Sequence, residues 1–102
     1  MIITTTDQVP GHQISEVLGM ARGSCMKGAT TILSSFSDAH HINRMLSEVD
    51  EVESDAIQKL TEHAKNLGAD AIIGARLQST ALEDAQNLKY VVTVYGTAVK
   101  LG

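Results

Sequence analysis

Apolar side chains recur at three- and four-residue steps through the middle of the chain, which is the spacing of one face of a helix. This stripe consists of Val49, Val52, Ala56, Leu60, Ala64 and Leu67. Ser47 and Asp50 form a variant capping box ahead of it, and acidic residues follow where the helix dipole favours negative charge. Gly68 stands where a left-handed C-cap residue is expected. The pattern predicts one long amphipathic helix that ends at residue 67.

A shorter helical segment is predicted ahead of this helix. Its apolar residues again follow helical spacing, and they are Phe36, Ala39, Ile42, Met45 and Leu46. Residues 22–35 are rich in glycine, serine and threonine, which is typical of a loop that holds at most a short strand. We therefore expect an irregular connection, a short helical segment and then the main helix.

Two segments near the N-terminus are predicted to be strands. Residues 2–6 are β-branched throughout, and residues 14–21 alternate imperfectly between apolar and polar side chains. Residues 7–11 between them form a turn cluster that contains the only proline. The two segments together predict a β-hairpin with a long connection, and Gly19 indicates a bulge or a close approach by another backbone.

Two further strands are predicted at residues 71–77 and 88–101, joined by a polar connection over residues 78–87. Gly74 and Gly96 lie inside these strands and indicate close packing by a helix or a neighbouring strand. The last strand carries apolar side chains on both faces. We expect the helix to cover one face and a neighbouring subunit to cover the other.

The composition limits the size of the core. The chain has 102 residues, which we interpret as a single domain over residues 1–102, and its three aromatic residues include no tryptophan. A domain of this size buries only roughly two-thirds of the surface that its unfolded chain exposes. The core is therefore expected to consist of small aliphatic side chains, and oligomerisation is one way to bury more surface.

Charge and cysteine content exclude several classes of function. The net charge is −4, the eight Lys and Arg residues are scattered, and aromatic stacking platforms are absent, so no nucleic-acid partner is expected. No window approaches the roughly 20 apolar residues of a membrane span, so no membrane partner is expected either. The single cysteine, Cys25, excludes an internal disulfide and fits a reducing compartment. A cytoplasmic location is expected.

The order of these segments resembles the YbjQ-like family of small bacterial and archaeal proteins, which carry a heavy-metal-binding label. The resemblance rests on the Ile-Ile-Thr-Thr-Thr start, the Val-Leu-Gly of the second strand, Leu67–Gly74 and the terminal Val-Tyr-Gly-Thr-Ala-Val. It implies an α+β, dodecin-like subunit with a small antiparallel sheet packed by helices. It also implies a ring-shaped homo-oligomer, a pentamer. Family members carry a Gly-Arg-Ser-rich segment with an aromatic residue before the main helix, whereas residues 43–48 of this chain depart from that pattern.

The candidate ligands for a transition or heavy-metal ion are Cys25, Asp38 and His41. Asp38 and His41 are three residues apart and would share a helix face, while Cys25 would approach from the preceding loop. The adjacent His40 would point about 100° away from His41. Alternatively, both histidines lie on a solvated face of the helix and bind no metal ion. His63 lies near the C-terminal end of the main helix, where its positive form would interact favourably with the helix dipole.

The sequence supports three classes of function. The leading hypothesis is an oligomeric binding or assembly protein without catalytic activity, with a metal ion as its candidate ligand. The alternatives are an enzyme with an intersubunit active site that uses Cys25 or a histidine, and a purely structural ring. No catalytic triad, phosphate-binding loop or closed metal motif is present in the sequence, and an inert thiol is the alternative for Cys25.

Overall fold

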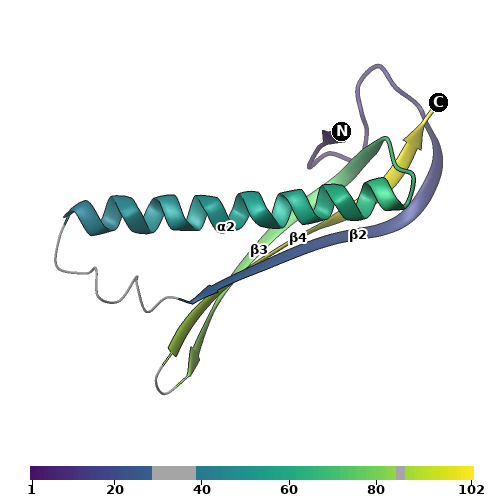
Figure 1. Cartoon of the computed structure of the whole chain (residues 1–102). Coiled ribbons are helices and arrows are strands. Elements are labelled where there is room, and N and C mark those ends of the chain that lie inside the picture. The colour runs from purple at the N-terminus through teal and green to yellow at the C-terminus, as the bar shows by residue number, and fades with distance from the viewer. Residues whose placement is uncertain (29–38, 85–86) are drawn as a thin grey trace.

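The computed structural model describes residues 1–28, 39–84 and 87–102. Over these residues, one helix lies across a four-stranded mixed sheet, which confirms the α+β class (Figure 1). The helix is α2 (Ala39–Asn66). The strand order is β1-β3-β4-β2, with β1 (Ile2–Ile3), β3 (Ala71–Asp84), β4 (Asn87–Leu101) and β2 (Ile14–Gly28).

The pairing of the N-terminal strands differs from the prediction. β1 and β2 do not form a hairpin: β1 pairs in parallel with β3, and β2 pairs antiparallel with β4. The predicted strand over residues 2–6 is regular only over Ile2–Ile3, although Thr4 and Thr6 still exchange backbone hydrogen bonds with the first half of β3. The strand predicted over residues 71–77 is present and pairs antiparallel with β4. The sheet is therefore antiparallel except at its short β1 edge.

α2 is one continuous helix, and the prediction of two helical segments divided at Ser47 was wrong. The apolar repeat keeps its spacing through that point, and no glycine or proline interrupts residues 39–66. The first turn of α2 holds no acidic residue, so the acidic run from Asp50 to Asp55 lies in the middle of the helix. Phe36 lies outside the described residues.

The C-terminal end of α2 agrees with the sequence. Gly68 adopts a positive φ of 84°. Its N–H donates to the carbonyl of Lys65, and the N–H of Ala69 donates to the carbonyl of Ala64. These two bonds form a Schellman motif, which satisfies carbonyl groups at the helix end and turns the chain directly into β3.

Two strands are longer than predicted. β2 continues through residues 22–28, which were expected to form a loop, and β3 continues through residues 78–84, which were expected to be a polar connection. Both additions pair with β4 along their length, so its ladder of hydrogen bonds decides their conformation more than their own polar sequence does. Gly19 lies at a register shift, which confirms the predicted bulge.

The main core lies between α2 and the sheet. Val52, Ala56, Leu60 and Ala64 of the helix are all buried against the sheet. Gly23 of β2 allows this close approach, because a Cβ atom there would overlap the Ala56 carbonyl oxygen and the Leu60 nitrogen. Close packing is also confirmed at Gly96, whereas Gly74, predicted to do the same, lies at the β3 register shift with φ +59°.

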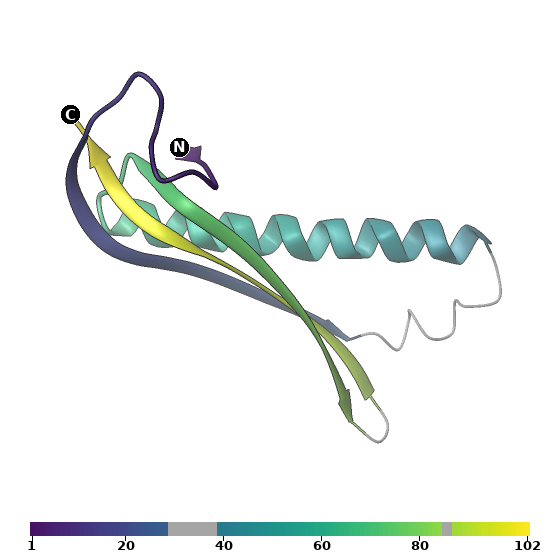
Figure 2. The ribbon, with the colours of Figure 1, turned by 180° about the vertical axis from the view of Figure 1, so that it is seen from behind.

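The second face of the sheet is covered at one end by the chain itself. The connection between β1 and β2 lies beside this end of the sheet in Figure 2. Val9 from this connection packs there with Ala71 and Val99 in a second small core. Along β4, the side chains of this face farther from Val9, Thr93 and Tyr95, are only half-buried. The N-terminal connection therefore supplies part of the cover that was expected from a neighbouring subunit.

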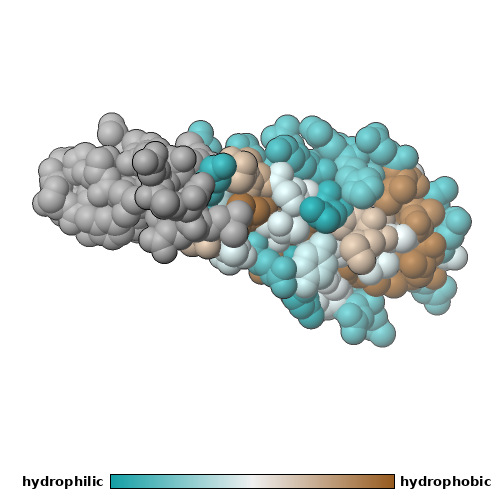
Figure 3. All heavy atoms as spheres, turned by 90° about the horizontal axis from the view of Figure 1, so that it is seen from below, coloured by the Kyte–Doolittle hydropathy of each residue, from teal (hydrophilic) through white to brown (hydrophobic). Residues whose placement is uncertain are grey.

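The molecule is elongated. Its extents are 53 × 26 × 18 Å and its radius of gyration is 16.6 Å, against about 13 Å for a compact domain of 100 residues. α2 alone is about 42 Å long, and its first turns lie away from every strand in Figure 1. Hydrophobic surface gathers towards the other end of the molecule in Figure 3. Among the exposed large apolar side chains of β2 are Ile14, Val17 and Met20.

Candidate functional site

Cys25 lies on a strand, not on the loop that the sequence predicted. It is opposite Val92 in the β2–β4 ladder, on the face of the sheet that α2 covers. Its side chain is half-buried and packs against the edge of the main core. The thiol is therefore held at a fixed position between strand and helix.

A hollow of about 240 Å³ lies beside Cys25. Its other lining residues all come from one side of α2, at one- to four-residue steps, and they are Asp55, Gln58, Lys59 and Glu62. The hollow thus combines one thiol, two carboxyl groups, one amide and one ammonium group. A thiol suits soft metal ions and carboxylates suit hard ones, so this donor set is mixed.

Two side chains of α2 cover the free edge of β2. The Lys59 ammonium donates a hydrogen bond of 3.0 Å to the Ser24 carbonyl oxygen. The backbone N–H of Arg22 donates to Nδ1 of His63 at 3.0 Å, and the Arg22 carbonyl oxygen lies 3.3 Å from the same nitrogen. Because an amide N–H can only donate, the shorter contact requires Nδ1 to be the unprotonated ring nitrogen.

Sequence reasoning missed this role of His63, which it assigned to the helix dipole. The available signal was the four-residue spacing of Lys59 and His63, which places both on one side of a helix. An exposed strand edge carries unpaired backbone groups that can pair with another chain. Lys59 and His63 satisfy two of those groups on β2, the Ser24 carbonyl and the Arg22 N–H, and shield that part of the edge.

The other two predicted metal ligands have no described side chains. Asp38 lies outside the described residues, and His41 belongs to α2 but its side chain is not described. Among the described residues, no group of three or more histidine, cysteine, aspartate or glutamate side chains is placed to hold a metal ion. The described residues of one chain therefore supply one soft donor atom, the Cys25 sulfur, but no closed ligand set.

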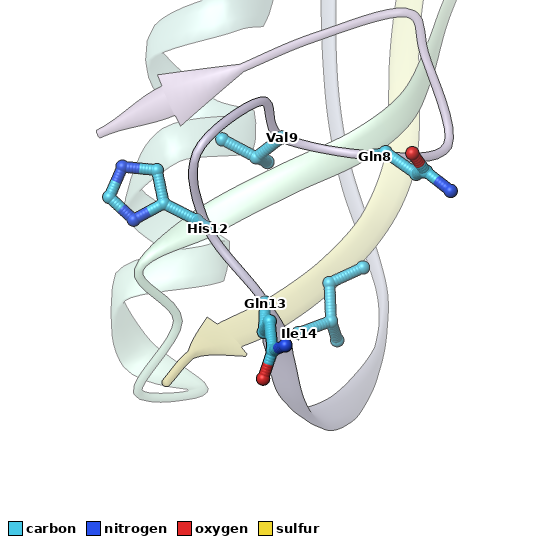
Figure 4. Close-up of a pocket in the computed structure, with 5 residues that line it drawn as sticks. All are labelled: Gln8, Val9, His12, Gln13 and Ile14. Carbon is cyan, nitrogen blue, oxygen red and sulfur yellow. The ribbon is translucent and has the colours of Figure 1, made fainter.

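A second hollow, of about 450 Å³, lies at the connection between β1 and β2 (Figure 4). Its lining residues carry amide, imidazole and aliphatic side chains and come from one segment, namely Gln8, Val9, His12, Gln13 and Ile14. The His12 ring points away from both glutamine side chains in Figure 4. This hollow lacks a set of polar groups that converge on one point.

Within residues 1–28, 39–84 and 87–102, we find no helix with the length and apolar character needed to cross a membrane.

Comparison with known proteins places the chain in a family. The model of the YbjQ_1 family, described as "Putative heavy-metal-binding", matches residues 1–102. UPF0145 proteins from Thermosipho melanesiensis and Halobacterium salinarum are 34% and 33% identical to this chain, over 99% of it and over 95% and 99% of their own lengths.

The fold is also found in a solved structure. A crystal structure of a protein of unknown function from Pediococcus pentosaceus, in the DUF74 family, matches with a TM-score of 0.72. The match covers 100% of this chain and 98% of that one at 23% identity, so it supports the fold alone. On the full-length family match and the relatives above 30% identity, this chain belongs to the YbjQ family, also called UPF0145.

Proposed function

We propose that this protein is the subunit of a cytoplasmic homo-oligomeric binding protein without catalytic activity, and that its ligand is a soft heavy-metal ion. The observation that carries the proposal is the shape of the subunit. About half of α2 extends beyond the core that its second half forms with the sheet, and large apolar side chains stay exposed on β2 and β3. Contacts between copies would bury both. The dodecin-like ring that the family resemblance implies, a pentamer, is the arrangement we propose.

Cys25 is the proposed anchor for the metal ion. Three properties support this role: its thiol is the only one in the chain, it is half-buried, and it faces a hollow that also holds Asp55 and Glu62. Thiolate is the protein ligand that soft metal ions prefer. Asp38 and His41 remain the proposed additional ligands, and the family description supports a metal as the ligand class.

Native mass spectrometry of protein purified without chelator or affinity metal tests both parts of the proposal. We expect a multiple of the 10.9 kDa subunit mass and, after addition of Cd²⁺, bound metal in proportion to the number of subunits. The Cys25→Ser variant should keep the assembly and lose the metal. Ser24→Ala, at the neighbouring position, is the matched control and should keep both.

The assembly, the Cys25 anchor and the additional ligands are each refuted by a different result. A monomer at all concentrations would refute the assembly. Unchanged Cd²⁺ binding by Cys25→Ser would refute the anchor. If Cys25→Ser lowers Cd²⁺ binding while Asp38→Asn and His41→Gln leave it unchanged, the anchor stands and the proposed additional ligands do not.

A further inference from the structure

An apolar groove runs beside α2 on the face of the sheet that the helix covers. Its volume is about 270 Å³, and it is lined by Ile3, Thr5, Ile57, Ala75, Arg76, Leu77 and Val94. The groove lies where α2, which packs mainly on β2 and β4, leaves the part of β3 around Leu77 exposed. Ile57 of the helix and Leu77 of the strand are 38% and 43% exposed. Each wall of the groove therefore keeps a partly exposed large apolar side chain among the described residues.

The chain also carries a helical segment that can fill such a groove. The part of α2 before Val52 lies away from the strands (Figure 1, Figure 2). In the sequence, its apolar residues repeat at the same three- and four-residue steps that Val52, Ala56, Leu60 and Ala64 use on the chain's own sheet; they are Ile42, Met45, Leu46 and Val49. Residues 39–51 make a segment of about 20 Å, which is long enough to lie along a groove of this size.

Charge also favours binding of this helical segment in the groove. Arg76 lines the groove, where its Nη1 atom donates to the carbonyl oxygens of Thr5 and Ala75, both at 2.9 Å. These two bonds fix the guanidinium group of a residue that lines the groove. The central part of α2 is acidic from Glu48 to Asp55. A helix laid in the groove would bring this acidic run towards Arg76.

We propose that the groove binds the first half of α2 of a second copy of this chain. This inference rests on the proposed function, because it names the contact through which the subunits assemble. Each copy offers the helix at one place and the groove at another, so the contact is head-to-tail. Such contacts propagate from copy to copy and form a ring where the rotation between copies closes.

The first test breaks each surface separately in the full-length chain. Leu77→Glu places a charge in the groove, and Ile42→Glu places one on the helical segment. Light scattering after size exclusion should report an oligomer for the wild type and a 10.9 kDa monomer for each variant, with unchanged circular dichroism. Gln78→Glu is the matched control: it adds the same side chain at the next residue of β3, on the opposite face, and should leave the oligomer intact.

The second test mixes the two monomers. Leu77→Glu keeps an intact helical segment and Ile42→Glu keeps an intact groove, so a head-to-tail contact predicts a heterodimer with one functional interface and nothing larger. A symmetric contact that needs both surfaces on both copies would give no heterodimer. If Leu77→Glu fails to fold, Ile57→Glu replaces it from the other wall of the groove.

The outcomes separate this inference from the proposed function. A wild-type monomer refutes the assembly and the groove contact together. A wild-type oligomer that survives Leu77→Glu and Ile57→Glu refutes the groove contact and leaves the assembly standing. Loss of the oligomer in Gln78→Glu, or the absence of a heterodimer on mixing, also refutes the groove contact.

Discussion

The two halves of α2 carry the same apolar repeat but have different surroundings. The second half, from Val52 to Ala64, presents its repeat to the sheet and forms the main core. The first half continues the same spacing in sequence, yet its ribbon lies away from every strand (Figure 1). The comparison shows that an apolar repeat predicts an amphipathic helix. It does not predict which element the apolar face packs against, because that depends on the rest of the fold. The following substitutions test the contrast, from the largest expected effect to the smallest.

Leu60→Ala should have the largest effect on stability. Leu60 is fully buried at the centre of the second half, so the substitution removes apolar contacts and leaves a cavity. The free energy of unfolding should fall by about 3 kcal/mol, within the usual range for such truncations. Urea unfolding at a fixed protein concentration measures it. A loss below about 1 kcal/mol would show that this half does not hold the core together.

Gly23→Ala should separate the helix from β2. The added Cβ would meet the backbone of α2 at Ala56 and Leu60, and backbone atoms cannot move aside as a side-chain end can. We expect a loss of about 2–3 kcal/mol, at the upper end for overpacking. Thermal unfolding is the measurement, and Ser24→Ala on the same strand is the control. Stability equal to the wild type would mean that the helix is not held this closely.

His63→Ala should open the edge of β2 without disturbing the core. The substitution removes the acceptor for the Arg22 N–H and should cost about 1 kcal/mol, which corresponds to about five-fold faster exchange of that amide proton. Hydrogen exchange followed by NMR reports it residue by residue. Glu62→Ala, at the preceding exposed position, should leave the Arg22 amide unchanged. Equal exchange rates in His63→Ala and the wild type would contradict the contact.

Met45→Ala should have the smallest effect on the isolated subunit. This position belongs to the first half of α2, where the ribbon lies away from the strands, and alanine is a good helix former. In the Leu77→Glu background, the free energy of unfolding should change by less than about 0.5 kcal/mol. A loss comparable to that of Leu60→Ala would erase the contrast between the two halves.

The sequence predicted well those features that depend on neighbouring residues. Within the predicted stripe, Val52 to Ala64 are buried against the sheet, whereas Leu67 is exposed. The C-cap at Gly68 and the strand that follows were confirmed. The division of the helix at Ser47 was wrong, because a good local capping pattern is overridden when the apolar repeat continues on both sides. Local signals of this kind mark where a helix can begin, not where it does.

The candidate site was less predictable. Cys25 was identified as a residue of interest, but its surroundings were not, because residues 22–28 resemble a loop in isolation and become a strand only through pairing with β4. The hydrogen bond from Arg22 to His63 joins residues 41 positions apart, and no periodicity reports such a contact. The predicted partners Asp38 and His41 stay predictions.

The sequence by itself determined the local elements of this protein: an amphipathic helix, its C-terminal cap and strands on either side of it. Spacing and capping act within a few residues, so they can be read along the chain. Only the tertiary structure decided that β1 lies parallel to β3, that β2 and β3 extend along β4, and that α2 covers two strands and leaves the groove beside a third. These features depend on hydrogen-bond ladders and packing between residues far apart in the sequence, whose pairing no local pattern specifies.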